Sequence, residues 1–134
     1  EGSAQLFTRE VMERPTTDFS ERGKATIARN ADRIGSIATL YETIAFRLHA
    51  MPPRDEKEYD RLYGLMFYTD YDEMAYELGW TMIKAIEDKD GKAAVFKVLA
   101  EDPKLFILRY QSLAKLDKKL PEFSDRFIEL VKSL

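Results

Sequence analysis

The sequence predicts an all-α protein, a helical bundle of five to seven helices with one long N-terminal helix. Apolar residues recur at intervals of three and four along most of the chain, and no stretch shows the sustained alternation of a strand. Helix-start and helix-stop signals also follow one another at short intervals. With 134 residues, 45% of them hydrophobic, and no cysteine, the chain is expected to be soluble and globular, with a core instead of disulfides.

The chain is predicted to have a short N-terminal segment and one domain. Residues 1–17 are expected to form an arm or a short helix, because Pro15 interrupts the apolar pattern. Residues 18–134 are expected to form a single helical domain. Asp18 and Glu21 have the spacing of a capping box, and Pro52 stops the helix that they open. The predicted helix is about 33 residues and roughly 50 Å long.

An apolar seam follows one face of this long helix. The spacing alternates between three and four residues, which suits either a core helix of the bundle or the interface of a coiled-coil dimer. Gly35 and Ser36 lie within the helix and could kink it. The seam consists of Ile27, Ile34, Ile37, Tyr41, Ile44 and Leu48, with Met51 at its end.

Four further start signals predict the helices of the remaining chain. Asp55 precedes a wide apolar stripe, and Asp70 precedes a helix that is apolar on more than one side and is therefore expected to be central. Gly91 marks a turn, Asp102 with Pro103 is a strong N-cap and first-turn pair, and Leu120–Pro121 is expected to start the last helix. The stripe after Asp55 is formed by Tyr59, Leu62, Tyr63, Met66 and Phe67.

Composition excludes several classes of function. A net charge of −3 without an obvious basic face predicts no nucleic-acid partner. No apolar run approaches the roughly 18 residues of a membrane span, so no membrane partner is expected. The lack of cysteine excludes a thiol nucleophile and a Cys-ligated metal, and it leaves the cellular compartment open.

No metal site and no cofactor are predicted. His49 is the only histidine, whereas a zincin helix needs two histidines four residues apart. The carboxylates of Asp70, Asp72, Glu73 and Glu77 suggest metal binding or acid–base work, or helix caps and a solvated helix face. The single histidine excludes the Glu-x-x-His pairs of a diiron bundle, and caps and surface account better for these acids.

Seven tyrosines are many for a chain of this length. Amphipathic tyrosines suit the rim of a helical bundle, where the ring is buried and the hydroxyl reaches water. They also suit a pocket for an apolar or aromatic ligand. The residues predicted to line such a pocket are Tyr63, Tyr76, Trp80 and Phe106.

One stretch resembles a known group of enzymes. It reads Tyr76-x-x-Gly79-x-x-Met82-x-x-x-Ile86-Glu87-x-x-x-Gly91-Lys92 and continues to Phe106 and Tyr110. This pattern is similar to the C-terminal helical part of zinc-dependent peptidases of the gluzincin kind, including uncharacterised families. The resemblance implies that a glutamate downstream of a His-Glu-x-x-His motif is the third zinc ligand, with Glu73 or Glu77 as the position to test.

The His-Glu-x-x-His motif itself is absent from this sequence. We therefore expect no catalysis by this chain as it stands, and a helical interaction or scaffolding domain related to such peptidases. A protein partner or self-association would then be its mode of action. The alternative is a small-ligand-binding or sensor domain that uses the aromatic pocket.

Overall fold

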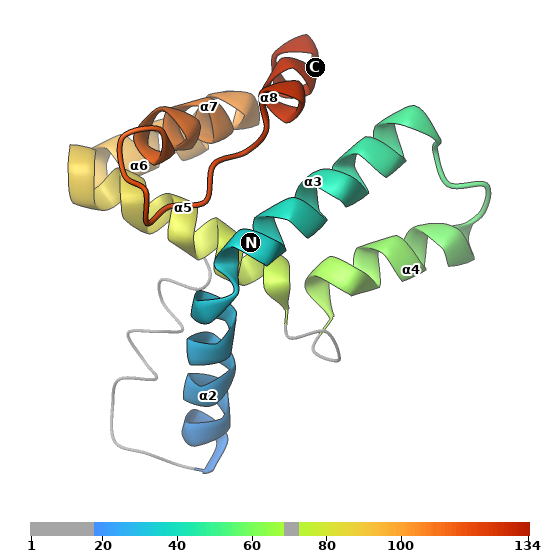
Figure 1. The fold of residues 1–134 in the computed structure, drawn as a ribbon, viewed down its shortest axis with the longest axis horizontal. Helices are drawn as coiled ribbons and strands as arrows, with labels where there is room; N and C mark the ends of the chain where they lie inside the picture. The colour runs from blue at the N-terminus through green and yellow to red at the C-terminus, as the bar shows by residue number, and fades with distance from the viewer. Residues whose placement is uncertain (1–17, 69–72) are drawn as a thin grey trace. The chain divides into compact units, whose positions relative to one another are not determined.

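The computed structural model describes residues 18–68 and 73–134, and this part of the chain is all-α, as predicted. The predicted arm at 1–17 and the start signal at Asp70 lie outside the described residues. The chain divides into two compact units, Glu1–Trp80 and Thr81–Leu134. The helices are α2 (Asp18–Asp32), α3 (Ile34–Ala50), α4 (Glu56–Phe67), α5 (Met74–Asp90), α6 (Lys92–Ala100), α7 (Pro103–Ala114) and α8 (Asp125–Ser133) (Figure 1).

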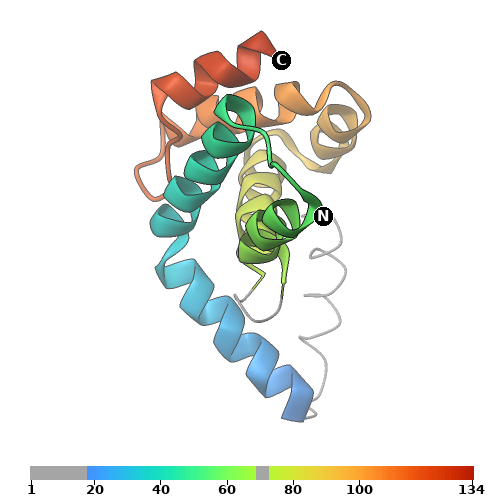
Figure 2. The same ribbon diagram turned by 90° about the vertical axis from the view of Figure 1, so that its right-hand side faces the viewer.

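The prediction of one long N-terminal helix was wrong: the chain forms α2 and α3, which meet at Arg33 (Figure 2). Arg33 has φ −113° and ψ 17°, outside the helical region. The buried side chain of Asn30 accepts hydrogen bonds from Nε and Nη2 of Arg33, at 3.2 and 2.8 Å. Gly35 and Ser36 then give the chain low helix propensity at this point. Local polar bonding thus competes with helix continuation.

In the first unit, α3 and α4 form a helical hairpin (Figure 1). The chain leaves α3 at Met51, and Pro52 and Pro53 prevent its continuation, as predicted. Asp55 caps α4 by accepting a 2.9 Å hydrogen bond from the N–H of Glu58. Ile44, Met66 and Ala75 form the buried cluster of this unit, with partly buried Leu40, Tyr41, Leu48, Leu62, Leu65 and Phe67 packed against it.

Helix α5 begins later than its start signal indicates. Its first residue is Met74, and Glu73 before it has φ 51°, in the left-handed region. The prediction that α5 is buried on more than one side is confirmed, because Ile83, off the main apolar stripe, is as fully buried as Ile86 on it. Gly91, with φ 85°, ends the helix as predicted.

In the second unit, α6 packs on α7 and α7 packs on α8. Asp102 caps α7 by accepting a 3.0 Å bond from the N–H of Lys104, with Pro103 in the first turn, as predicted. Arg109 joins α7 to the end of α5 through two bonds to Asp90, of 2.7 and 2.6 Å. These side-chain bonds lower the pKa of Asp90.

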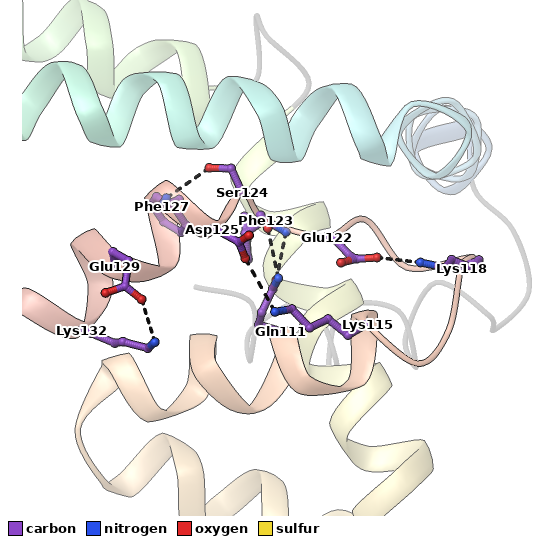
Figure 3. Close-up of polar contacts among 10 residues, drawn as sticks. All are labelled: Gln111, Lys115, Lys118, Glu122, Phe123, Ser124, Asp125, Phe127, Glu129 and Lys132. Atoms are coloured by element: carbon purple, nitrogen blue, oxygen red, sulfur yellow. Dashed lines mark hydrogen bonds and ion pairs between the residues drawn. The ribbon is translucent and has the colours of Figure 1, made fainter.

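The connection between α7 and α8 corrects a second prediction. Leu120–Pro121 does not start the last helix, which begins at Asp125 with Ser124 as its N-cap. The side-chain amide of Gln111 holds the preceding residue, Phe123, at both backbone groups: Nε2 donates to the carbonyl at 3.0 Å, and Oε1 accepts from the N–H at 2.9 Å (Figure 3). These two hydrogen bonds hold the buried Phe123 outside the helix, which starts after it.

Aromatic rings complete this α7–α8 corner, which we define as Tyr110, Gln111, Ala114, Phe123 and Phe127. Tyr110 is fully buried, and its hydroxyl donates a 2.8 Å bond to the carbonyl of Pro121. The ring of Phe123 lies 5.8 Å from that of Tyr110 and 4.9 Å from that of Phe127. Burial raises the pKa of Tyr110, so its hydroxyl stays protonated and keeps donating.

Candidate functional site, an apolar cavity between α3 and α4

The α3–α4 hairpin forms a cavity of about 230 Å³ that is partly open to solvent. Its walls come from one face of each helix, because the lining residues of both helices recur at intervals of three and four. We call it the α3–α4 cavity. It is lined by Tyr41, Ile44, Ala45 and Leu48 of α3, and by Tyr59, Leu62, Tyr63, Met66 and Phe67 of α4.

Aromatic rings stack along the α4 side of the cavity. Tyr63 is central: its ring lies nearly parallel to that of Phe67, with centroids 4.5 Å apart, and 6.0 Å from that of Tyr59. The ring of Tyr68 meets Tyr63 edge-on at 5.9 Å. Each ring restrains its neighbour, so the aromatic wall has a defined shape.

The opening turn of α4 is fixed to the end of α3 by the carboxylate of Glu58. Its Oε1 accepts from Nη2 of Arg47 at 2.5 Å, and its Oε2 accepts from the backbone N–H of Arg54 at 2.9 Å. The backbone bond from Arg54 is the main cause that lowers the pKa of Glu58, so the carboxylate remains charged. The Arg47–Glu58 bond joins the end of α3 to the first turn of α4, and the Arg54 bond fixes the intervening turn to the same carboxylate.

No lining residue of the cavity carries a formal charge. Burial raises the pKa of Tyr41, so this phenol is neutral throughout the ordinary pH range. The cavity therefore presents hydrocarbon, aromatic faces and phenol hydroxyl groups to an occupant.

The four residues predicted as a ligand pocket lie on three helices. Tyr63 lines the α3–α4 cavity, and Tyr76 on α5 meets the ring of Phe67 edge-on at 6.0 Å. Trp80 is half-buried on α5. Phe106 is half-buried on α7, in the second unit. A pocket shared by all four stays a prediction.

Of the residues that line the cavity, only Tyr63 was predicted from the sequence as a ligand-pocket residue. The signal for the others was present, because the stripe of α3 and the stripe of α4 flank the Pro52–Pro53 turn and must face each other in a hairpin. Of the predicted seam, Tyr41, Ile44 and Leu48 face this cavity, and Ile37 is buried within the chain. A dimer interface along the seam stays a prediction.

The residues present do not fit a zinc site of the peptidase kind. His49 is the only histidine of the sequence and is exposed in the last turn of α3. Glu73 precedes α5, and Glu77 is buried within it. Among residues 18–68 and 73–134, no three His, Cys, Asp or Glu side chains gather as metal ligands. Zinc sites draw their ligands from histidine, cysteine and carboxylate side chains, usually with several nitrogen or sulfur donors, and this chain offers one histidine and no cysteine.

Fold and site thus define a helical protein with an apolar cavity and without an assembled metal centre among its described residues. In the same part of the chain, no helix has the length and apolar character needed to cross a membrane. The family model described as "Putative zinc dependent peptidase (DUF5700)" matches residues 1–119, and the chain belongs to this family. Searches of curated proteins and of solved structures found no match. The resemblance seen at Tyr76–Tyr110 is thereby confirmed.

Proposed function

We propose that this chain is a non-catalytic helical module of a zinc-peptidase family, which acts through contacts with other protein segments. The observation that carries the proposal is the donor set: a family described by zinc-dependent peptidase activity is represented here by a chain with one exposed histidine and no cysteine. A zinc site would then require ligands from another polypeptide, and the helices of this chain would support that site.

Zinc binding and peptide hydrolysis by the purified chain test this proposal. We expect zinc to be removed completely by a weak chelator, no cleavage of fluorogenic peptides, and no change of either result in Glu73→Gln or Glu77→Gln. His49→Ala serves as the matched control at the only histidine. One tightly held zinc per chain that is lost in Glu77→Gln, or cleavage that depends on Glu73 or Glu77, would overturn the proposal.

Self-association is one form of the proposed interaction. The seam members Ile27 and Ile34 are partly exposed, whereas Ile37 and Ile44 are buried within the chain. Light scattering on a size-exclusion column would show a dimer if the exposed part of the seam is an interface, and Ile27→Lys would then restore the monomer. A monomer in the unsubstituted chain would exclude this form and leave a different protein as the partner.

The prediction that residues 18–134 form one domain belongs to the same proposal. If they do, circular dichroism and the fluorescence of Trp80, the only tryptophan, will report one shared unfolding transition. Two separated transitions would instead assign independent stability to the two compact units.

A second candidate function is small-ligand binding, which the α3–α4 cavity favours. A preformed apolar cavity is the usual form of a small-molecule site. The predicted residues Tyr63, Tyr76, Trp80 and Phe106 give this function a spectroscopic test. A ligand that raises the melting temperature and also quenches Trp80 would support the full predicted pocket. A ligand that raises the melting temperature without this quench would restrict the site to the cavity residues.

A further inference from the structure

The α3–α4 cavity is large enough to hold an organic molecule. An apolar cavity of about 150 Å³ in another protein stays free of water and binds benzene. The α3–α4 cavity measures about 230 Å³ and has a comparable lining, with Leu48, Met66 and Phe67 among its walls. Water gains little from the hydrocarbon part of this partly open lining, because an ordered water needs two to four polar partners.

The lining also selects against charge. None of the nine lining residues is an acidic or basic residue, and the nearby carboxylate of Glu58 is already engaged by Arg47 and Arg54. A charged ligand would lose its hydration without gaining a partner ion, and this desolvation is costly. An uncharged ligand loses little on entry.

The aromatic wall favours a flat ligand. Tyr63 and Phe67 stack with centroids 4.5 Å apart, and Tyr59 extends the row by another ring. A ligand ring inserted beside them gains offset or edge-on contacts beyond simple area burial. Ala45 opposite them on α3 is small and leaves the space open.

We infer that the α3–α4 cavity is a binding site for a small, uncharged aromatic molecule of one or two rings. This inference rests on the second function proposed above and names its ligand class and site. It does not depend on the family's peptidase chemistry.

Methionine methyl NMR tests the inference on the unaltered chain. Met66 lines the cavity, whereas Met51 is exposed and Met82 is buried elsewhere. Titration with toluene is expected to move the Met66 methyl signal saturably, through ring-current shifts, and to leave Met51 and Met82 in place. Benzoate and benzylamine, which carry the same ring with opposite charges, should need at least fivefold higher concentrations.

Two tryptophan variants provide the matched control. Ala45→Trp should fill the cavity and weaken toluene binding at least tenfold, whereas Ala50→Trp, on the exposed end of the same helix, should leave it unchanged. An unmoved Met66 signal, equal shifts at all three methionines, or equal binding by Ala45→Trp would overturn the inference. The zinc and hydrolysis measurements are independent of these outcomes, so failure here leaves the proposed helical module standing.

Discussion

The α3–α4 hairpin and the α7–α8 corner are both aromatic-rich helix pairs, but the hairpin borders an apolar cavity, whereas Tyr110 and Phe123 of the corner are buried. In the corner, Gln111 bonds both backbone groups of Phe123 and Tyr110 bonds the carbonyl of Pro121. In the hairpin, polar bonds lie at the turn around Glu58, and the facing walls are apolar. Directional bonds thus hold the corner together, whereas the facing walls of the hairpin meet through apolar contacts.

The difference shows that aromatic content alone does not decide whether a site is a core or a pocket. Buried polar side chains that are fully satisfied fix a unique arrangement. Two apolar helix faces can bury surface area at several distances from each other. In the hairpin, the turn between α3 and α4 restricts that distance. Substitutions that remove polar groups of the corner or fill the cavity of the hairpin test this difference between the two regions.

Removal of the Gln111 amide is expected to have the largest effect. Gln111→Ala removes both side-chain hydrogen bonds to the buried backbone of Phe123, and losing a partner of a buried donor or acceptor costs about 1–3 kcal/mol. We expect the free energy of unfolding to fall by about 3 kcal/mol in urea titrations. Lys118→Ala removes only the exposed pair with Glu122 and should cost less than about 0.5 kcal/mol. A loss below about 1 kcal/mol in Gln111→Ala would show that the corner does not depend on this bond.

Matched alanine-to-leucine changes compare the two packings directly. Ala114 in the corner is fully buried, so Ala114→Leu overpacks it and should cost about 1–3 kcal/mol. Ala45 borders the cavity, so Ala45→Leu should be neutral or stabilise by up to about 1 kcal/mol, through added buried area. Hydrogen exchange of the amides in α7 and α3 would measure each effect locally. Equal losses at both positions would contradict the presence of open space in the hairpin.

The Tyr110 hydroxyl links the corner to pH. Tyr110→Phe removes the bond to Pro121 and should cost about 1–2 kcal/mol at neutral pH. Because burial raises the pKa of Tyr110 above the ordinary value of about 10, the unfolded chain ionises first as pH rises. The unsubstituted protein should then lose up to about 1.4 kcal/mol per pH unit above about pH 10 from this group.

The variant lacks this titration, so its stability deficit should shrink between pH 9 and pH 11. Urea titrations at both pH values measure the change. A deficit that stays constant across this interval would mean that Tyr110 ionises equally well in the folded chain.

Helix caps are expected to give the smallest and most equal effects. Asp55→Ala and Ser124→Ala each remove one side-chain bond to a backbone N–H, of 2.9 and 3.1 Å, at the start of α4 and α8. Each should cost about 1 kcal/mol in thermal or urea unfolding. Because a cap acts within one turn, the two costs should agree despite the different packing around them. A cost at Ser124 twice that at Asp55 would show that the cap is coupled to the corner.

The elements that the sequence determined by itself depend on signals a few residues apart. Asp55 and Asp102 cap helices because their side chains reach N–H groups two or three residues ahead. Pro52 and Gly91 end helices through their own backbone preferences. The all-α class followed from the apolar periodicity of the sequence. The family relation was predicted from one stretch of the sequence, Tyr76 to Tyr110.

Tertiary structure decided the features that depend on residues far apart in the sequence. One further feature depended on two local structures of similar stability. The last helix starts after Phe123, whose backbone is bonded by Gln111, twelve residues earlier. That further feature is the break at Arg33, where side-chain bonds between Asn30 and Arg33 compete with continuation of the helix. The cavity is the space left between two stripes, and residue spacing along one chain gives the faces but not the distance between them. The Glu58 carboxylate, which joins α4 to Arg47 of α3, and the apolar packing between the two helices are tertiary contacts of this kind.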